Sequence, residues 1–349
     1  MHEDESEFLA GRFEAHRTHL RAVAYRMLGS LSEADDAVQE AWLRLSRSDV
    51  GGVENLGGWL TTVVGRVCLD MLRSRAARRE DSLEARLPDP VVSRASGVDP
   101  EQQALVADSV GLALLVVLES LAPRERLAFV LHDLFGVPFD DIAPVVGRSS
   151  AAARQLASRA RRRVQGSAPV PDVDVARQRE VVDAFLAASR RGDFSGLVAV
   201  LDPEVVLRAD LGALPGGRRE IRGAEHVAGQ ALLFRGRNVA RPALVNGAPG
   251  IVSTSPEGEP AAVMSFTISA GRIAGIDILA DRDRSARWTS PCWGEPGRQG
   301  PDRIPSATRR LRRRPSAGLP RNSPPATTTL PRRIVVTGQP ATSQPSHGL

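Results

Sequence analysis

The stretch NLGGWLTTVVGRVCLDMLRSRAARR, residues 55–79, organises the interpretation of the whole chain. Its apolar residues recur at helical spacing and predict a helix with one buried face: Leu60, Val64, Val67 and Met71. Its last turns carry Arg73, Arg75, Arg78 and Arg79. Cations interact favourably with the C-terminal end of a helix dipole, but four arginines are more than the dipole alone would explain. A helix that packs on one side and presents guanidinium groups on the other is suited to binding phosphates; a solvated basic end of a core helix is the competing interpretation.

Length and composition limit the class of protein. A chain of 349 residues should form two or three domains of ~100–200 residues each. No apolar run approaches the ~18 residues of a membrane span, and the acidic start MHEDESE does not resemble a signal peptide. We therefore expect a cytoplasmic protein with no membrane contact. The two cysteines, Cys68 and Cys292, provide neither a disulfide framework nor a zinc cluster, so no metal site and no cofactor are predicted.

Charge is distributed unevenly along the chain. Residues 288–349 hold 10 arginines and 2 acids, whereas the preceding residues hold 36 arginines and 39 acids, a net charge of −3. All basic residues are arginine, since the chain has no lysine. A DNA-binding hypothesis must therefore rest on local clusters rather than on net charge.

Two predicted helices precede the opening stretch, over residues 7–26 and within SEADDAVQEAWLRL, residues 32–45. The second has apolar residues on its inner side and an acidic, polar outer face. That face contains Asp35, Asp36, Gln39 and Glu40. From the residues alone, a solvated face and a protein-binding face are equally good interpretations.

A second helical unit, residues 103–166, follows a polar, proline-containing stretch at residues 81–102 that predicts a flexible linker. A short helix over 139–146, a turn at Gly147 and a last helix to about Val164 make a helix-turn-helix pattern. The spacing predicts that the last helix packs through Ala153, Leu156, Ala160 and Val164. Its other side carries arginine, glutamine and serine, which read base edges in a major groove.

The pattern changes after a second linker at residues 167–174. Predicted helices over 175–190, 194–201 and 224–233 combine with strands over 205–210, 242–245, 261–269 and 272–279. This mixture predicts an α+β domain, residues 175–287, with a pocket between helices and sheet. Residues 288–349 are rich in Pro, Ser, Thr, Gly and Arg without periodicity, which predicts a disordered basic tail.

Several blocks together resemble one known family. SEADDAVQEAWLRL followed by NLGGWLTTVVGRVCLDMLRSRAARRE resembles region 2 of the extracytoplasmic-function sigma factors. LAPRERLAFVLHDLFGVPFDDIAPVVGRSSAAARQLASRARRRV resembles their region 4. The appended domain is similar to SnoaL-like cones, which points to the sigma-J-type subgroup. The resemblance covers about residues 8–279 and implies a multidomain fold: all-α region 2 over 7–80, an all-α region 4 helix-turn-helix over 103–166, an α+β cone over 175–287 and the tail.

The resemblance also implies a role for individual residues. The helix that docks on core RNA polymerase is matched by Asp35, Asp36, Gln39, Glu40 and Trp42. The segment that captures the −10 element during promoter melting is matched by Trp59, Arg66, Arg73, Arg75, Arg78 and Arg79. For Trp59, a core anchor and a base-stacking platform remain equal alternatives. The −35 recognition helix is matched by Ser150, Arg154, Gln155, Ser158, Arg159 and Arg162. The implied partners are core RNA polymerase and promoter DNA.

The third domain resembles a built-in regulator that packs on the sigma domains and tunes promoter opening. Cones of this type also include ketosteroid isomerases, which need a carboxylate base and an oxyanion donor, often tyrosine. The single tyrosine, Tyr25, lies outside this domain, and the remaining candidates are Asp202, Asp210, Asp277 and His226. No catalytic residue and no enzyme activity are predicted. The segment LPGGRR, residues 214–219, resembles a glycine-rich basic loop that touches the sigma domains or the polymerase.

The end of the chain departs from the family pattern. After the last strand the family continues with a short Asp/Asn-Pro-Asp/Glu-Lys/Arg-Leu signature, whereas this chain reads ADRDRSARWTSPCWG. GC-rich codons for residues 288–293, shifted by one base, spell Leu-Asp-Leu-Ala-Val-Leu. We therefore hypothesise that the chain runs out of frame from about Arg282 onward; a gene sequence whose shifted frame lacks an apolar continuation would contradict this.

Two other function classes remain as alternatives to a sigma factor. One is a ligand-sensing helix-turn-helix regulator that acts without core polymerase, which would not need the acidic docking face at residues 35–42. The other, less favoured, is a ketosteroid-isomerase-like enzyme with DNA-binding appendages.

Overall fold

The computed structural model describes residues 2–48, 53–78, 87–94, 111–167, 171–212, 217–233, 235–281 and 284. Arg79, the side chain of Arg78 and the predicted tail over residues 288–349 lie outside these ranges. The chain divides into two units, residues 1–296 and 297–349, and every described residue belongs to the first.

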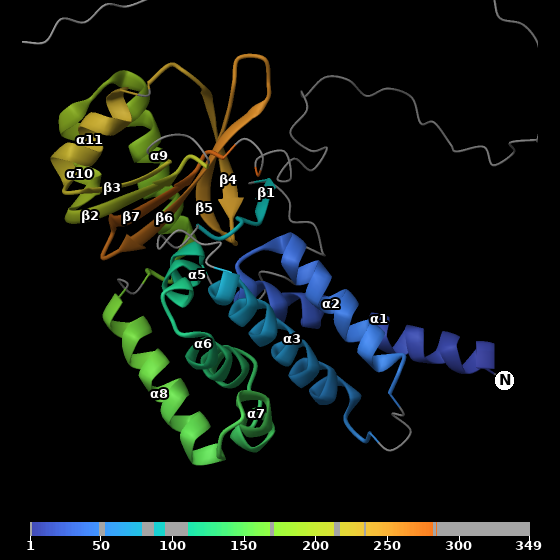
Figure 1. The fold of residues 1–349 in the computed structure, drawn as a ribbon. Helices are drawn as coiled ribbons and strands as arrows, with labels where there is room; N and C mark the ends of the chain where they lie inside the picture. The colour runs from blue at the N-terminus through green and yellow to red at the C-terminus, as the bar shows by residue number, and fades with distance from the viewer. Residues whose placement is uncertain are drawn as a thin grey trace, which may run out of the picture. The chain divides into compact units, whose positions relative to one another are not determined.

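Three helices form the N-terminal helical part: α1 (His2–Leu28), α2 (Leu31–Leu45) and α3 (Leu56–Arg78) (Figure 1). α1 ends at Gly29, whose φ of 68° lies in the left-handed region that favours glycine. α2 turns Ala34, Ala37 and Ala41 inward, each fully buried, so that small side chains allow α1 and α3 to approach closely. The predicted stripe of α3 is confirmed for Leu60, Val64 and Val67, which are buried.

Five further helical segments form the second helical part: α5 (Leu112–Glu119), α6 (Pro123–Phe129), the π-helical turn η1 (Val130–Leu134), α7 (Phe139–Val146) and α8 (Ser150–Ser167). Pro123 occupies the first turn of α6, where its missing N–H has no partner to lose. Between α7 and α8, Gly147 has a φ of 65°, which produces the predicted tight turn. The predicted helix-turn-helix is therefore confirmed.

The two helical parts share one hydrophobic core. A single cluster of buried residues includes Leu60 and Val64 of α3 together with Leu127 of α6 and Leu131 of η1. α3 approaches α6 closely at Gly65, where an added Cβ would lie 3.1 Å from Leu127 Cδ1 and 3.2 Å from Leu131 Cδ1. The absence of a side chain at Gly65 therefore allows this contact.

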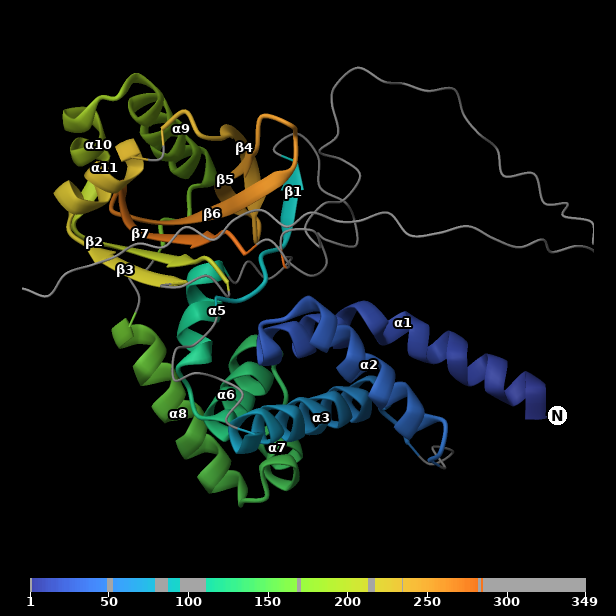
Figure 2. The same cartoon turned by 45° about the horizontal axis from the view of Figure 1, so that its top comes forward.

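The remaining described residues form the predicted α+β cone. Its seven strands lie in the order β1-β4-β5-β6-β7-β2-β3, and their bounds are β1 (Val92–Arg94), β2 (Leu201–Asp210), β3 (Arg218–Arg222), β4 (Val239–Val245), β5 (Ala248–Thr254), β6 (Pro260–Ser269) and β7 (Arg272–Leu279). Neighbouring strands are antiparallel, except that β2 and β7 are parallel. Three helices group on one side of this sheet: α9 (Val175–Arg191), α10 (Phe194–Val200) and α11 (Ala224–Leu233) (Figure 2).

The two faces of the sheet pack into different clusters. On the helix side, Ile276 of β7 lies in a cluster with Phe185 and Leu186 of α9. On the other side, Leu279 lies in a second cluster with Leu87 and Val92, against which Val116 of α5 packs. This alternation is what the two-residue period of a strand requires when both faces are covered.

The prediction of a flexible linker over residues 81–102 does not hold for residues 87–94. Leu87, Val91 and Val92 are buried, and β1 pairs with β4 so that Val92 lies opposite Val245. β1 is an edge strand of the sheet. Strands β3 and β5 were also absent from the sequence prediction.

Candidate polymerase and nucleic-acid interfaces

The outer face of α2 is largely exposed, as the docking prediction requires. Asp36 and Gln39 are exposed and Glu40 is half-buried. Leu43, which the sequence prediction omitted, lies one helical turn beyond Gln39 and is 37% exposed. An apolar side chain next to acidic ones suits a protein-binding surface better than a purely solvated one. We call Asp36, Gln39, Glu40 and Leu43 the α2 face.

Three of the five predicted docking residues have partners within the chain. Glu40 Oε1 accepts a hydrogen bond from Arg44 Nε of the same helix at 3.1 Å. Asp35 Oδ1 accepts a hydrogen bond from Arg21 Nε at 2.6 Å, which ties α2 to α1. The ring of Trp42 lies 5.2 Å from the ring of Phe13, between centroids, and packs against the helical core. Trp42 therefore positions α2 more than it extends the α2 face.

The arginines at the end of α3 differ in their surroundings. Arg73 is exposed, and its Nη1 lies 3.8 Å from Asp70 Oδ1, a weak surface pair. Arg75 forms an ion pair with Glu33 of α2, and only 24% of its side chain is exposed. Arg73 therefore remains accessible to a phosphate, whereas Arg75 is committed to α2.

Trp59, near the start of α3, and Arg66, in its middle, both contact other parts of the protein. Trp59 is partly buried and packs against the helical core, which favours the core-anchor interpretation. Arg66 is exposed, but its Nη2 donates to the Pro144 carbonyl of α7 at 3.3 Å. Arg66 therefore contacts the second helical part in the structure described here.

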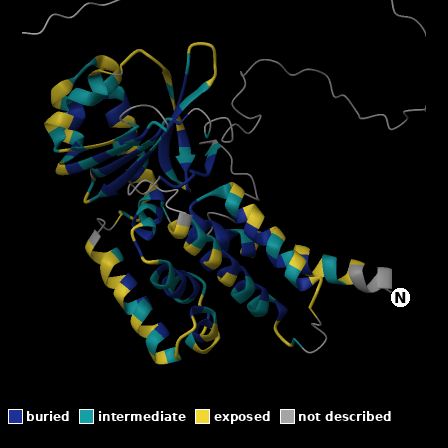
Figure 3. Ribbon diagram, in the orientation of Figure 1, coloured by how far each residue is buried: buried dark blue, intermediate teal, exposed yellow. Residues whose placement is uncertain are grey.

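The outer side of α8 is the most open of the three surfaces (Figure 3). Its exposed residues are Arg154, Gln155, Arg159 and Arg162. Ala153, Ala157 and Ala160 on the inner side are fully buried. The predicted division of faces is thus confirmed, with Ala157 as an additional packing residue.

Hydrogen bonds and ring contacts fix the ends of α8. Ser150 Oγ donates to Asp140 Oδ1 at 2.5 Å, which joins the start of α8 to α7. The guanidinium carbon of Arg154 lies 5.2 Å from the centroid of the Phe139 ring, a cation–π distance. Arg161 Nε donates to Asp133 Oδ1 of η1 at 2.8 Å. Arg154 is thus held in place while remaining exposed, and Ser158 is half-buried.

A polar network that the sequence prediction missed surrounds Asp89. Its backbone N–H donates to the Gly29 carbonyl at 2.7 Å, and its Oδ2 accepts from the Leu31 N–H at the start of α2 at 3.1 Å. Arg284 Nε donates to Asp89 Oδ1 at 2.9 Å, and Arg284 Nη1 lies 3.1 Å from Asp210 Oδ2 at the end of β2. Residues 87–91, which we call the Asp89 segment, are therefore bonded to both α2 and the sheet.

Tyr25 and Asn246 complete this network. The Tyr25 hydroxyl donates to the Asp89 carbonyl and accepts from Asn246 Nδ2 at 3.0 Å. Burial raises the pKa of Tyr25 well above its usual range, so the hydroxyl stays protonated and remains a donor. Asn246 has a φ of 49° and Gly247 a φ of 79°, the left-handed pair of a hairpin turn. An Asn-Gly dipeptide between β-rich runs was the signal that could have identified this turn.

Comparison with known proteins decides the family of the chain. The Sigma-70 region 2 model matches residues 12–78, and the Sigma-70, region 4 model matches residues 111–164. The ECF RNA polymerase sigma factor SigJ of Mycobacterium tuberculosis is 39% identical over 292 residues, which cover 78% of this chain and 91% of SigJ. This chain is an extracytoplasmic-function sigma factor.

Two further comparisons support this assignment. The probable ECF RNA polymerase sigma factor SigI of Mycobacterium tuberculosis is 37% identical over 281 residues, 78% of this chain and 92% of that protein. The crystal structure of Mycobacterium tuberculosis SigJ matches the sigma factor described here with a TM-score of 0.64 and 36% identity, over 79% of this chain and 98% of that one. Sigma factors direct RNA polymerase to promoters and are not an enzyme family. The predicted fold class and function are therefore confirmed.

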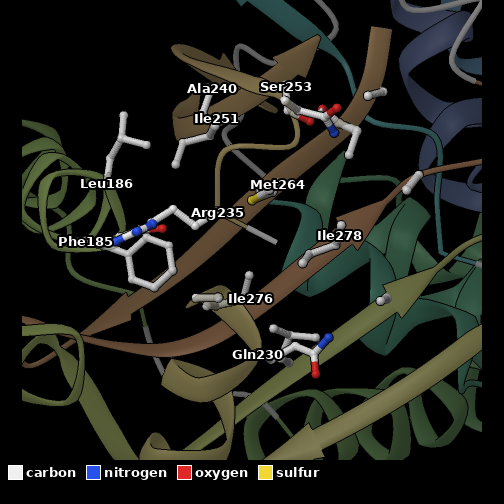
Figure 4. A pocket seen from close by; sticks show the side chains of 18 of the residues that line it. Phe185, Leu186, Gln230, Arg235, Ala240, Ile251, Ser253, Met264, Ile276 and Ile278 are labelled. Atoms are coloured by element: carbon white, nitrogen blue, oxygen red, sulfur yellow. Dashed lines mark hydrogen bonds between the residues drawn. The ribbon is translucent and has the colours of Figure 1, made fainter. Parts of the chain in front are cut away.

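The α+β cone of this sigma factor contains a partly open cavity of about 790 Å³ between its helices and its sheet (Figure 4). Among the described residues that line it there is no aspartate, glutamate, histidine or tyrosine. Asp202, Asp210 and Asp277, the carboxylates considered as a general base, all lie outside this lining. Asp277 instead pairs with Arg208 at 3.4 Å on a buried site, where desolvation raises its pKa above the usual value.

Within the described residues, no helix is long and apolar enough to cross a membrane. No group of three or more His, Cys, Asp or Glu side chains within those ranges is placed to hold a metal ion. The adjacent His132 and Asp133, the type of pair that can ligate a metal, contact protein groups: the His132 ring stacks on Phe139 with centroids 3.8 Å apart, and Asp133 pairs with Arg161.

Proposed function

We propose that this sigma factor docks on core RNA polymerase through the α2 face, holds the −10 element with α3 and reads the −35 element with α8. The proposed domains are region 2 over residues 7–80, region 4 over 103–166 and the cone over 175–287, with residues 81–102 between the regions. Core polymerase and promoter DNA are the proposed partners. Because both are found with the chromosome, we place its action in the cytoplasm.

The open side of α8 is the observation that carries this proposal. Arg154, Gln155 and Arg159 are exposed on a helix that follows a tight turn and is anchored by buried alanines. This combination lets a helix enter a major groove while its inner face stays packed. Arginine and glutamine can form bidentate contacts with guanine and adenine, each worth about 1–3 kcal/mol of discrimination.

Run-off transcription with purified core polymerase tests the α8 assignment. On promoter fragments selected by the reconstituted holoenzyme, Arg154→Ala with Arg159→Ala should reduce −35-dependent initiation about tenfold or more, since each lost base contact is worth about 1–3 kcal/mol. Arg163→Ala is a matched control, because Arg163 lies on the same helix and its Nη1 is 4.0 Å from Glu125. Loss of core binding in the double variant, or no polymerase-dependent initiation by the parent, would contradict the assignment.

We also infer that the described arrangement must open before both promoter elements are bound. By their names the two elements are about 25 positions apart, which is ~85 Å at about 3.4 Å per base pair. α3 and α8 contribute to one hydrophobic cluster, and Arg66 of α3 donates to the Pro144 carbonyl of α7. Helices held in a common core do not span that distance, so this packing is a closed form.

The Asp89 network is the proposed restraint on opening. It links α2 to the sheet through Tyr25, Asn246 and Arg284. We therefore assign the cone the role of an intramolecular regulator that holds residues 87–91 and, with them, the closed form. The absence of a general base among the described cavity-lining residues supports a regulatory role over catalysis by the cone.

A further inference from the structure

The cavity of the cone has the size of a small-molecule site. At about 790 Å³ it falls within the ~300–1,000 Å³ that ligand pockets occupy. Protein interiors normally pack at crystal-like density, so a space of this size is not a packing defect. Small side chains on several elements leave this space open: Ala209, Ala231, Ala240 and Ala262.

The walls of the cavity are mostly apolar, with Ser189, Gln230, Asn238 and Ser253 as the uncharged polar side chains among the described lining residues. Figure 4 shows Ile276 and Ile278 of β7, Met264 of β6 and Ile251 of β5 on the sheet side, with Phe185 of α9 opposite them. Walls of this kind offer water few hydrogen-bond partners, so they favour an apolar occupant over water.

The charged groups at the cavity are all cations. Four arginines from separate parts of the cone line it: Arg190, Arg191, Arg219 and Arg235. The chain before residue 288 has a net charge of −3. The cavity lining, which has arginines and no acid among its described residues, therefore carries a charge of the opposite sign. A negatively charged group entering this cavity would meet no repelling carboxylate among its described lining residues.

Two of these arginines remain available for a ligand. Arg190 donates to the Ala240 carbonyl at 2.7 Å, and Arg191 lies 3.8 Å from Asp193. Arg219 and Arg235 form no ion pair with any residue in the described ranges, and the Arg235 guanidinium lies beside Gly192 at the end of α9. Both arginines line the cavity, from β3 and from the turn after α11, and both are exposed to solvent.

We propose that this cavity binds an amphipathic anion: one carboxylate, sulfate or phosphate group on a hydrocarbon body. The isoleucine, methionine and phenylalanine walls receive the hydrocarbon, and Arg219 and Arg235 pair with the anionic group. Guanidinium groups form charge-assisted hydrogen bonds with all three headgroups. Because the described lining holds no acid–base group, the ligand is bound and not converted.

Calorimetric titration of the full-length chain, without polymerase, tests this inference directly. The probes share a ten-carbon chain: decanoate, decyl sulfate, decyl phosphate, decanol and decylammonium. At least one of the three anions should bind with one site per chain, and the anion that binds best identifies the headgroup. Decanol should bind more weakly, and decylammonium should not bind measurably.

Variants separate the cavity from the surface. Arg219→Gln with Arg235→Gln should weaken binding of the best anion about tenfold, because the variant loses the charge-assisted hydrogen bonds to the headgroup. Arg241→Gln with Arg272→Gln is the matched control, because both are exposed arginines of the cone outside the cavity. Ala231→Phe or Ala209→Leu, whichever folds by circular dichroism, should block binding by filling the space.

Three results would overturn the inference. They are equal affinity for decylammonium and the anions, unchanged affinity in the folded cavity-filling variant, and no binding of any of the three anions. Because no polymerase or DNA takes part, these outcomes are independent of whether the proposed promoter contacts are correct.

Discussion

Tyr25 is the residue through which α1, the Asp89 segment and the β4–β5 turn meet. Its hydroxyl donates to the Asp89 carbonyl and accepts from Asn246 Nδ2. Tyr25→Phe leaves both partners buried without this bond, which should lower the free energy of unfolding by about 1–3 kcal/mol. Urea unfolding measures the change. Ser46→Ala removes an exposed hydroxyl bonded to the Leu43 carbonyl and should change stability by less than ~0.5 kcal/mol; equal effects of the two variants would show that the buried hydroxyl contributes nothing special.

The buried carboxyl of Asp277 should make the free energy of unfolding depend on pH. Burial raises its pKa, while Arg208 opposes the rise. An acid with a raised folded-state pKa binds its proton more tightly in the folded protein, so the free energy of unfolding falls as the pH rises from ~3.9 through the folded-state value. The Asp277→Asn variant has no carboxyl group to titrate at this position, so its free energy of unfolding should fall less over the same pH range. Thermal or urea unfolding across that range measures it, and parallel curves for the two proteins would contradict the prediction.

Side-chain exposure could be predicted from the sequence better than side-chain pairing could. The open face of α8 followed from the periodicity of Ala153 and Ala160. The ion pair between Arg75 and Glu33 did not, because the two residues lie on different helices, 42 positions apart. Periodicity reports which side of a helix faces solvent, but it carries no information about which neighbour arrives there.

At the scale of elements, the sequence predicted long amphipathic helices well and short strands poorly. β5 was missed although an Asn246-Gly247 turn precedes it, and β3 was missed because RREIR, residues 218–222, is charged. β1 was missed because prolines precede it in a polar stretch. Each of these strands is stabilised by its neighbour in the sheet and not by its own composition, which is why tertiary context overrides local propensity.

The contact between α3 and α6 can be tested at Gly65. A leucine there would force its side chain against Leu127 and Leu131, which already lie within 3.2 Å of a Cβ at that position. Overpacking of this kind costs about 1–3 kcal/mol. Gly11→Leu in α1 is the matched control: nothing lies within 4 Å of its Cβ, and leucine should stabilise the helix by up to about 1 kcal/mol.

Hydrogen exchange of α6 and η1 reports the outcome. Gly65→Leu should speed exchange in these segments, and Gly11→Leu should not. Unchanged exchange together with unchanged stability in Gly65→Leu would mean that α3 and α6 are not in the contact described, and the inference of a closed form would fail with it.

At the scale of the whole molecule, the contacts of Arg284 indicate where the proposed frame change begins. Its side chain is only 13% exposed and pairs with both Asp89 and Asp210. A residue with two buried acidic partners fits the folded domain, which favours a frame change after Arg284 over one starting near Arg282. The hypothesis of a shifted frame for residues 288–293 remains a prediction that the gene sequence decides.

Arg284 also tests whether the cone restrains the sigma regions. Arg284→Gln removes the cation that pairs with Asp89, while Asp210 keeps Arg218, whose Nη2 lies 3.9 Å from its Oδ2. Breaking a buried pair costs about 3–5 kcal/mol. Because Asp89 also accepts the Leu31 N–H at the start of α2, its release should loosen the closed form and raise initiation several-fold in run-off transcription at limiting sigma factor. Arg272→Gln, at an exposed position of the same domain, should leave initiation unchanged. Equal initiation by Arg284→Gln and the parent, with core binding intact, would show that the network supports the fold without restraining it.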